Sequence, residues 1–454
     1  MTRLIIKGGT VVDPINDRVY PADISVVDGR IAAIDSGFSK RKGTMFIDAR
    51  GCLVVPGLID MHVHLREPGF EYKETIASGA AAAARGGFTA LCAMPNTRPV
   101  CDSAAAVHFV KKRAFEAGYA RVYPIGAITR ESAGKELAPF GEMKAAGAVA
   151  FSDDGSWVAD GNLMRRAMEY AGMLGVPVIS HCEDPSLAAG GVMNEGYTAT
   201  VMGLRGMPAA AEEAAVARDI ILAELTGCRL HIAHVSTAGT VRLIREAKAR
   251  GVKVTAEVTP HHFTLTDEAV GGYDTNAKVN PPLRTTADVA AVIGGLADGT
   301  IDVIATDHAP HSLEEKEREF DAAPFGIVGL ETAVGLVFSQ LINPGVLTLT
   351  QAVKKLTVNP ASILGLPPGA VVEGSVADLT IIDPGREIRV DPADFISRGK
   401  NTPFTGRMLK GIPVGTVSGG RWITTDASID RIHEKWQKEL TTEAQSTQRG
   451  RTEL

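Results

Sequence analysis

An alternation of short apolar runs with longer helix-like stretches across residues 56–365 constrains the fold of this 454-residue chain most strongly. The strand-like runs, counted from the one that leads into this region, lie at residues 53–61, 90–94, 121–125, 148–151, 177–180, 230–234, 253–257 and 302–306. Eight strands alternating with helices over roughly 250 residues or more predict an α/β fold of the (β/α)8 TIM-type barrel class. A doubly wound open sheet is the alternative, but no G-x-G-x-x-G motif follows a strand, so its dinucleotide-binding form lacks support.

The two ends of the chain have the pattern of β structure. Residues 1–55 hold short apolar runs separated by Gly8-Gly9 and by Asp28-Gly29, and an Asp-Gly pair between two such runs predicts a hairpin. Strand-like runs return over residues 366–425. We therefore expect both ends to form one small β-sandwich domain beside the barrel, followed by a polar C-terminal tail over residues 426–454.

The composition limits the partners and the compartment. The net charge is -6 with acidic and basic residues mixed throughout, so a nucleic-acid surface, which needs a basic stripe, is not expected. The longest run of small apolar residues, 80–84, is far too short to span a membrane. Five scattered cysteines without a C-x-x-C pair predict a reducing, cytoplasmic location.

Two histidines one residue apart, His62 and His64, end the first strand of the predicted barrel. Alternate side chains of a strand share a face, so both imidazoles point the same way, as two ligands of one metal ion must. Arg66 continues that face. Packing explains such a pair about equally well, so the other strand ends have to decide between the two interpretations.

Imidazole and carboxylate side chains recur at other strand ends, which meet at one mouth in a (β/α)8 barrel. Six groups converge there, namely His62, His64, His181, His234, one of Asp153 and Asp154, and Asp307. This convergence favours a metal site over packing. His234 is preferred to His231 because it lies nearer the end of its strand, whereas the pattern does not say which of the adjacent Asp153 and Asp154 points inward.

Six ligands suit two metal ions rather than one. One ion needs about three or four protein ligands, and a pair roughly 3.5–4 Å apart shares a bridging carboxylate and water. Imidazole and carboxylate ligands favour zinc, although manganese, cobalt or iron would also fit. Such a centre makes a hydroxide available near neutral pH.

Three further residues fit substrate binding, although each has an alternative as a turn, capping or surface residue. Arg66 can clamp a carboxylate, and Asn96 and Asn280 offer amide donors and acceptors. We expect Glu257 to be structural, with a position behind the ligands or facing the substrate as the alternative. We expect the charged run over residues 314–319 to be a solvated face, with a lid as the alternative.

In its sequence motifs the chain resembles the class I (bacterial-type) dihydroorotases of the amidohydrolase superfamily. The motifs that carry the resemblance are Asp60-Met-His-Val-His-Leu-Arg-Glu-Pro-Gly69, Met94-Pro-Asn-Thr97, Ser152-Asp-Asp-Gly155, His181-Cys-Glu-Asp184, Asn280-Pro-Pro-Leu-Arg284, Ala305-Thr-Asp-His-Ala-Pro-His311 and Pro324-Phe-Gly-Ile327.

The resemblance implies reversible hydrolysis of dihydroorotate to N-carbamoyl-aspartate in pyrimidine biosynthesis, with two zinc ions per subunit. It implies that one ion is held by His62, His64 and Asp307, and the other by His181 and His234. It makes Asp154 the bridge between them. Many relatives bridge with a carboxylated lysine, and the shorter aspartate bridge predicts weaker binding of the second metal.

The implied mechanism begins when a metal-bound hydroxide attacks the ring amide, and Asp307 carries the proton to the leaving nitrogen. The substrate contacts implied by the resemblance are His64, Arg66, Asn96, Asn280, His311 and the backbone of Phe325-Gly326. The resemblance also suggests a homodimer and a complex with aspartate transcarbamoylase. The alternatives are a related hydantoinase or allantoinase, which needs no carboxylate clamp, and a non-catalytic scaffold subunit, which would have lost a ligand.

Overall fold

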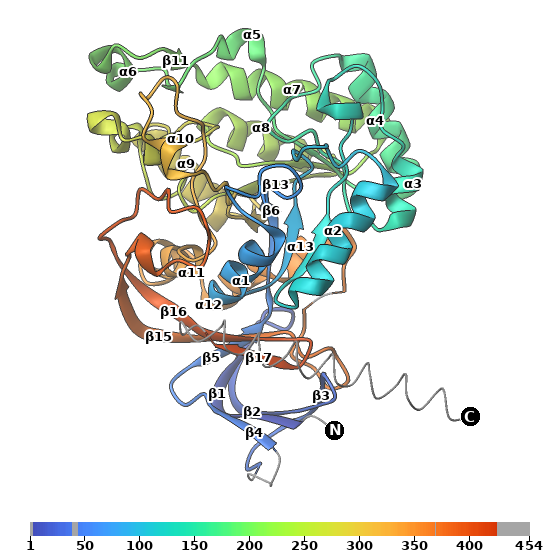
Figure 1. Ribbon diagram of the computed structural model, residues 1–454, viewed down its shortest axis with the longest axis vertical. Helices are drawn as coiled ribbons and strands as arrows, with labels where there is room; N and C mark the ends of the chain where they lie inside the picture. Colours follow the sequence, from blue (N-terminus) through green and yellow to red (C-terminus); the bar gives the residue numbers. More distant parts are fainter. Residues whose placement is uncertain (1–2, 39–43, 368, 425–454) are drawn as a thin grey trace.

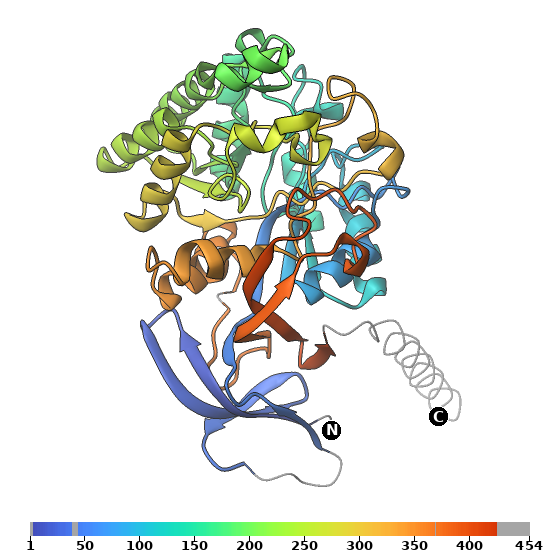
Figure 2. The same cartoon turned by 90° about the vertical axis from the view of Figure 1, so that its left-hand side faces the viewer.

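The computed structural model describes residues 3–38, 44–367 and 369–424, and its fold is mixed α/β, as predicted (Figure 1). The predicted polar tail over residues 426–454 lies outside the described residues. Short parallel strands are surrounded by helices in one part of the molecule, and a sheet of longer strands lies below them (Figures 1 and 2). None of the helices in the described part of the chain is long and apolar enough to cross a membrane.

The parallel strands form two groups, one in the order β6-β7-β8 and one in the order β14-β13-β12-β9. Single bridges join the groups, from Gly126 to Phe151, from Phe151 to Val178 and from Val63 to His308, so the pairings lead from β6 round to β14 and back to β6. The strand predicted over residues 148–151 is reduced to the two bridges at Phe151. The bounds are β6 (Leu58–Val63), β7 (Phe88–Ala93), β8 (Arg121–Pro124), β9 (Val178–Ser180), β12 (Leu230–Ile232), β13 (Val254–Val258) and β14 (Val303–Ile304).

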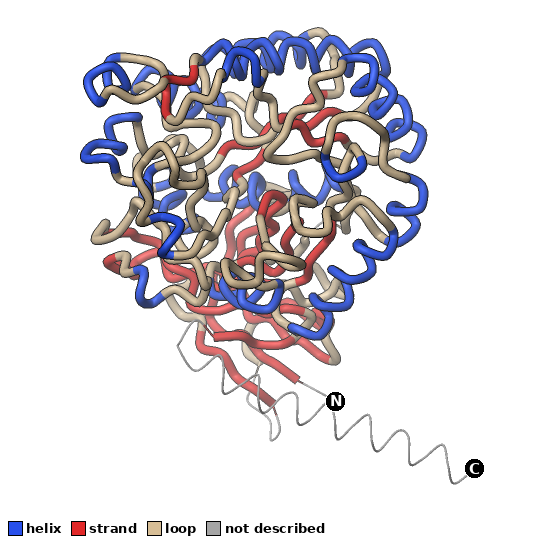
Figure 3. Tube along the Cα trace, turned by 45° about the horizontal axis from the view of Figure 1, so that its top comes forward, coloured by secondary structure: helices blue, strands red, loops and turns tan. Residues whose placement is uncertain are grey.

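Helices lie around the outside of these strands (Figure 3). Their ends follow the usual signals, as in α1, where Thr75 and Ser78 form a capping box, and in α4, which ends at the left-handed Gly175. The longer helices are α1 (Ile76–Arg85), α2 (Ala104–Ala117), α3 (Phe140–Ala146), α4 (Gly161–Leu174), α7 (Ala209–Thr226), α8 (Ala238–Ala249), α9 (Thr286–Ala297), α12 (Leu349–Leu356) and α13 (Val358–Leu364). Shorter elements are η1 (Arg130–Ser132), α5 (Pro185–Ala188), β10 (Met193–Asn194), α6 (Tyr197–Met202), β11 (Gly206–Met207), η2 (Asp267–Tyr273), η3 (Thr275–Ala277), α10 (Leu313–Lys316), α11 (Ala333–Val337), η4 (Phe338–Ile342) and η5 (Pro392–Asp394).

Strands from both ends of the chain pair in one eight-stranded sheet. Its order is β17-β16-β15-β5-β1-β2-β3, with β4 beside β1, and the two ends meet where β5 runs antiparallel to β15. The bounds are β1 (Arg3–Asp13), β2 (Arg18–Val27), β3 (Arg30–Asp35), β4 (Thr44–Asp48), β5 (Leu53–Pro56), β15 (Leu379–Arg389), β16 (Met408–Ser418) and β17 (Arg421–Thr424). Side chains from these strands form an apolar cluster of their own, which contains Val54 and Leu379, both fully buried.

The two predicted turns at the N-terminal end had different outcomes. The hairpin at Asp28-Gly29 is confirmed, because Val27 pairs with Arg30 and both turn residues have positive φ, as a two-residue type I′ turn requires. The separation predicted at Gly8-Gly9 is wrong, because β1 continues through the pair with only a shift of register. Gly8, at φ 73°, absorbs the irregularity that a side chain would resist.

Truncating Leu379 should destabilise the sheet that joins the two ends of the chain. Leu379→Ala removes a fully buried side chain at the strand that pairs with β5, so we expect the free energy of unfolding to fall by about 2–5 kcal/mol. Urea unfolding followed by circular dichroism measures the change. Met45→Ala is the control, because Met45 lies in the same sheet but is 54% exposed. Equal effects of the two substitutions would contradict the expectation.

Candidate metal centre

The predicted ligands lie at the C-terminal ends of the parallel strands, where they are buried. His62 belongs to β6 and His64 follows it, while His181 and His234 follow β9 and β12. Asp154 lies just after the bridge at Phe151, and Asp307 follows β14. All six residues are at most 8% exposed, so the strand ends bring them together in the interior.

Asp154 lies between two groups of histidines that could each hold a metal ion. One group is His62, His64 and Asp154, and the other is Asp154, His181 and His234, with the ligand atoms of each group within 4.8 Å of one another. The carboxylate oxygens of Asp154 lie 3.3 Å from His62 Nε2 and 3.4 Å from His64 Nε2. Asp154 Oδ1 also lies 3.8 Å from His181 Nδ1 and 3.7 Å from His234 Nε2.

The neighbouring Asp153 is turned away from these histidines. Its Oδ1 accepts hydrogen bonds from the amides of Ile128, at 2.8 Å, and Thr129, at 3.0 Å, and its Oδ2 accepts one from the Thr129 hydroxyl. Adjacent residues of an extended chain face opposite sides, so Asp153 anchors a loop while Asp154 faces the histidines.

Asp307 approaches the first group of histidines. Its Oδ1 lies 3.0 Å from His64 Nε2 and 3.5 Å from His62 Nε2. Burial tends to raise the pKa of Asp307, but the His62 and His64 imidazoles outweigh it and hold that pKa well below its usual range. Asp307 and His234 both have positive φ, a conformation that non-glycine residues adopt rarely and that concentrates at functional sites.

The donor set fits metal ions. His62 Nε2 and Asp154 Oδ1 are buried, yet neither makes a hydrogen bond within the described part of the protein. Buried polar atoms almost always have a partner, and a cation between these atoms would supply one. Imidazole nitrogens with carboxylate oxygens are typical ligands of zinc and related divalent metals.

Glu257, in β13, holds His62 from behind. Glu257 Oε1 lies 2.5 Å from His62 Nδ1, and Oε2 lies 3.1 Å from His231 Nε2. Burial raises the pKa of Glu257, but the charge of His62 and the hydrogen bonds from His231 and His62 lower it to about 2. A carboxylate that binds Nδ1–H leaves Nε2 as the ligand atom and fixes the orientation of the ring.

These contacts favour the alternative interpretation of Glu257. It was expected first to be structural, but it joins the buried His231 to a candidate ligand, His62. The available signal was a carboxylate inside the apolar strand Val254–Val258, since a buried charge requires a partner.

The predicted substrate residues gather beside the first group of ligands. Asn96 Oδ1 lies 2.8 Å from His64 Nδ1. Arg66 donates to the Pro310 carbonyl at 3.1 Å, and its Nη2 lies 3.2 Å from His311 Nε2. Burial, with help from the cations Arg66 and Lys73, lowers the pKa of His311 to about 3, so this imidazole is neutral.

The other predicted substrate contacts are Asn280 and the backbone of Phe325-Gly326, and they differ in whether they already have hydrogen-bond partners. Asn280 Oδ1 is buried without a hydrogen-bond partner among the described residues. The Phe325 carbonyl lies 2.8 Å from His311 Nε2, whereas the Gly326 amide donates to the Lys278 carbonyl at 2.9 Å. The sequence did not indicate these bonds, because they join segments that are distant along the chain.

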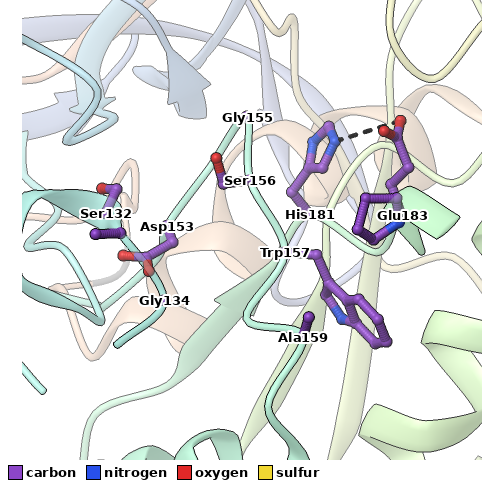
Figure 4. Close-up of a pocket in the computed structure, with 11 residues that line it drawn as sticks. Ser132, Gly134, Asp153, Gly155, Ser156, Trp157, Ala159, His181 and Glu183 are labelled. Atoms are coloured by element: carbon purple, nitrogen blue, oxygen red, sulfur yellow. Dashed lines mark ion pairs between the residues drawn. The ribbon is translucent and has the colours of Figure 1, made fainter. Parts of the chain in front are cut away.

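A cavity of about 360 Å³ adjoins the second group of histidines (Figure 4). His181 and Glu183 line one side of it, and the His181 Nε2 to Glu183 Oε2 distance is 3.8 Å. Ser132, Asp153, Ser156 and Trp157 are among the residues that line the rest, so polar groups face the space beside His181.

Comparison with known proteins identifies relatives over nearly the whole chain. Residues 51–240 match the sequence profile of a family described as Dihydro-orotase-like. The chain is 64% identical to a dihydroorotase of Pelotomaculum thermopropionicum over 427 residues, which cover 94% of this chain and 100% of the relative. It is 53% identical to a dihydroorotase of Syntrophus aciditrophicus, over 92% of this chain and 98% of the relative.

Solved structures with the same arrangement of elements include two hydantoinases. The L-hydantoinase (dihydropyrimidinase) from Arthrobacter aurescens superposes with a TM-score of 0.83 at 28% identity, covering 93% of this chain and 96% of that one. The D-hydantoinase (dihydropyrimidinase) from Thermus sp. superposes with a TM-score of 0.81 at 26% identity, covering 93% and 95%.

Glu257→Gln should weaken metal binding without removing a candidate ligand. The amide cannot accept two imidazole N–H bonds as the carboxylate does, so His62 loses its fixed orientation, and we expect metal affinity to fall about 10–100-fold. Titration against a chromophoric chelator measures the affinity. Glu212→Gln is the matched control, because Glu212 is also buried but binds Ser236. Unchanged affinity in folded Glu257→Gln would argue against this role.

Proposed function

The chain belongs to the dihydroorotase family, and on that premise we propose that it catalyses the reversible hydrolysis of dihydroorotate to N-carbamoyl-aspartate in pyrimidine biosynthesis. The observation that carries the proposal is the identity of 64% to a dihydroorotase over the full length of that relative. The reaction makes the chain a cyclic amidohydrolase, the class to which the structurally similar hydantoinases also belong.

We infer a (β/α)8 barrel with a β-sandwich built from both chain ends, with the barrel over residues 56–365 and the sandwich over 1–55 and 366–425. Two observations support this inference. The parallel pairings lead from β6 through the other strands and back to β6, and β5 pairs with β15 across the two ends. Active sites of such barrels lie at the C-terminal ends of the strands, which is where the histidines gather.

We infer two zinc ions at this centre. His62, His64 and Asp307 would hold one, and His181 and His234 the other, with Asp154 shared because it lies within reach of both groups. When bound, the ions would supply a nucleophilic water near neutral pH and polarise the scissile carbonyl. Glu257 and Asn96 keep two of the imidazoles oriented through their Nδ1 atoms.

Asp307 is the group that moves the proton in the proposed reaction. Hydrolysis adds water across the ring amide bond, so one proton of that water must reach the leaving nitrogen. The carboxylate of Asp307, whose Oδ1 lies 3.0 Å from His64 Nε2, is placed beside the candidate ligands where it can accept that proton. The carboxylate then returns the proton to the nitrogen as the carbon–nitrogen bond breaks.

Arg66 supplies the charge that the substrate carboxylate requires. Its guanidinium lies beside His311, whose lowered pKa leaves it neutral, so a carboxylate meets a cation and a neutral hydrogen-bonding group. The unpartnered Oδ1 of Asn280 can accept a hydrogen bond from an amide N–H of the ring. A hydantoinase would share the metal ligands, but its substrates carry no carboxylate for Arg66 to bind.

We also propose a homodimer, a cytoplasmic location and a complex with aspartate transcarbamoylase. The homodimer and the complex rest on the family resemblance, and the location rests on the five scattered cysteines without a C-x-x-C pair. The small-molecule substrate follows from the dihydroorotase assignment itself.

Asp307→Asn should abolish turnover while leaving the fold intact. The amide cannot accept the proton, so we expect kcat for dihydroorotate to fall by about 10²–10⁴-fold. Absorbance of the ring measures turnover, and circular dichroism and metal analysis accompany it. Asp302→Asn is the control, because Asp302 lies at the other end of the same strand and pairs with Lys248. Turnover like that of the wild type in Asp307→Asn would refute the assigned role.

Arg66→Ala should weaken the binding of substrates that carry a carboxylate. We expect kcat/KM for dihydroorotate to fall by about 10–100-fold, as for loss of a hydrogen-bonded charge, with much less effect on hydantoin. Purified, metal-analysed wild type assayed with dihydroorotate, hydantoin and allantoin side by side tests the proposed function. A wild type that prefers a neutral ring would refute that function, and equal losses of Arg66→Ala on both substrate classes would refute the clamp.

A further inference from the structure

Lys278 is a buried lysine whose amino group is surrounded by backbone carbonyls. It is 2% exposed, and its Nζ donates to the carbonyls of Phe320, Asp321 and Ala323 at 2.6, 3.1 and 2.7 Å. The Nζ atom also lies 4.6 Å from the centroid of the Phe325 ring. Its three protons are therefore directed at one short segment of the chain.

Lys316, the last residue of α10, approaches the same segment with its own amino group. It is 4% exposed although it lies in the charged run that was expected to be a solvated face. Its Nζ donates to the carbonyls of Pro324 and Gly326 at 2.9 and 3.1 Å. The Lys316 carbonyl in turn accepts a hydrogen bond from the hydroxyl of Thr275, which fixes the end of the helix.

The segment over residues 320–326, which we call the anchored loop, has no helix or strand of its own. The five carbonyls that bind the two lysines accept no backbone amide within the described residues. Carbonyls without a partner are costly when buried, so the two lysines supply bonds that secondary structure would supply elsewhere. Further bonds tie Gly326, through its amide to the Lys278 carbonyl and through its carbonyl to Asn401.

The anchored loop ends at the residues that face the proposed substrate. The Phe325 carbonyl is 2.8 Å from His311 Nε2, and that nitrogen is 3.2 Å from the Arg66 guanidinium. A displacement of the loop would therefore change the position of His311 and of the carboxylate clamp. The metal ligands belong to other segments and make no bond to either lysine amino group in the described part of the chain.

We propose that Lys278 and Lys316 are positioning residues, which hold the anchored loop in the conformation that binds substrate. The inference rests on the proposed function, because the bound molecule is taken to be dihydroorotate. Each amino group acts through the loop and not on the reacting atoms, so its loss should weaken substrate binding more than the chemical step.

Lys278→Met and Lys316→Met test the proposal, because methionine keeps an unbranched apolar side chain and removes the donors. We expect KM for dihydroorotate to rise about tenfold, or about 1.4 kcal/mol, with kcat and metal content little changed. Lys355→Met is the matched control, because Lys355 is also a buried lysine, and its Nζ binds the Ile301 carbonyl, away from the loop. It should lower stability and leave KM unchanged.

Hydrogen–deuterium exchange adds a readout that is independent of activity. The hydrogen-bonded amides of Ala322, Ala323 and Gly326 should be protected in the substrate-free wild type and should exchange faster in both loop variants, but not in Lys355→Met. If a variant does not fold, hydrogen–deuterium exchange of the wild type with and without substrate still tests the proposal. A loop that becomes protected only when substrate binds would overturn it. Unchanged KM in folded variants of an active wild type would overturn this inference alone. A wild type inactive on dihydroorotate would instead refute the proposed function.

Discussion

The buried carboxylate of Asp154, shared by two groups of imidazoles, is the constraint on which the rest of the site depends. A carboxylate with almost no exposure is costly unless opposite charge or hydrogen-bond donors surround it. Here burial raises the pKa of Asp154, and the neighbouring imidazoles His62, His234 and His64 reverse that effect and lower the pKa well below its usual value. The fold must therefore bring residues from four strand ends to one point, and it tolerates positive φ at His234 to do so.

The residues behind the ligands explain how these strand ends keep a common geometry. Glu257 joins His62 to His231, so three strands, β6, β12 and β13, are tied by one carboxylate. Asp60, in β6, ties this strand to the segment that follows β14. Its Oδ1 accepts hydrogen bonds from the amides of His62 and Thr306, both at 3.1 Å. The bonds from Glu257 and from Asp60 to Thr306 join different strands close to the candidate ligands, where a shift of one strand would separate these ligands.

The sequence predicted those parts of the site that depend on local periodicity and on the ends of apolar runs. The period of two placed His62 and His64 on one face, and the strand ends located Asp307. It could not choose between Asp153 and Asp154, because that choice depends on the loop at Thr129, which lies about twenty-five residues away. The choice between the two interpretations of Glu257 was undecidable for the same reason, since its partners His62 and His231 belong to different strands.

In the fold too, features set by neighbouring residues were predictable, and features set by residues far apart along the chain were not. The Asp28-Gly29 hairpin was predictable because the turn itself requires two residues with positive φ. The strand over residues 148–151 was predicted at full length, yet only its last residue, Phe151, forms bridges, while Val149 and Ala150 make single backbone hydrogen bonds to Pro124 and Gly126. The anchored loop is the feature least predictable from the sequence. Its shape depends on two lysines that bind backbone carbonyls, and every residue type has a backbone carbonyl. A site that recognises its substrate through such a loop can therefore change its affinity by substitutions at Lys278 or Lys316, while every ligand of the metal centre stays the same.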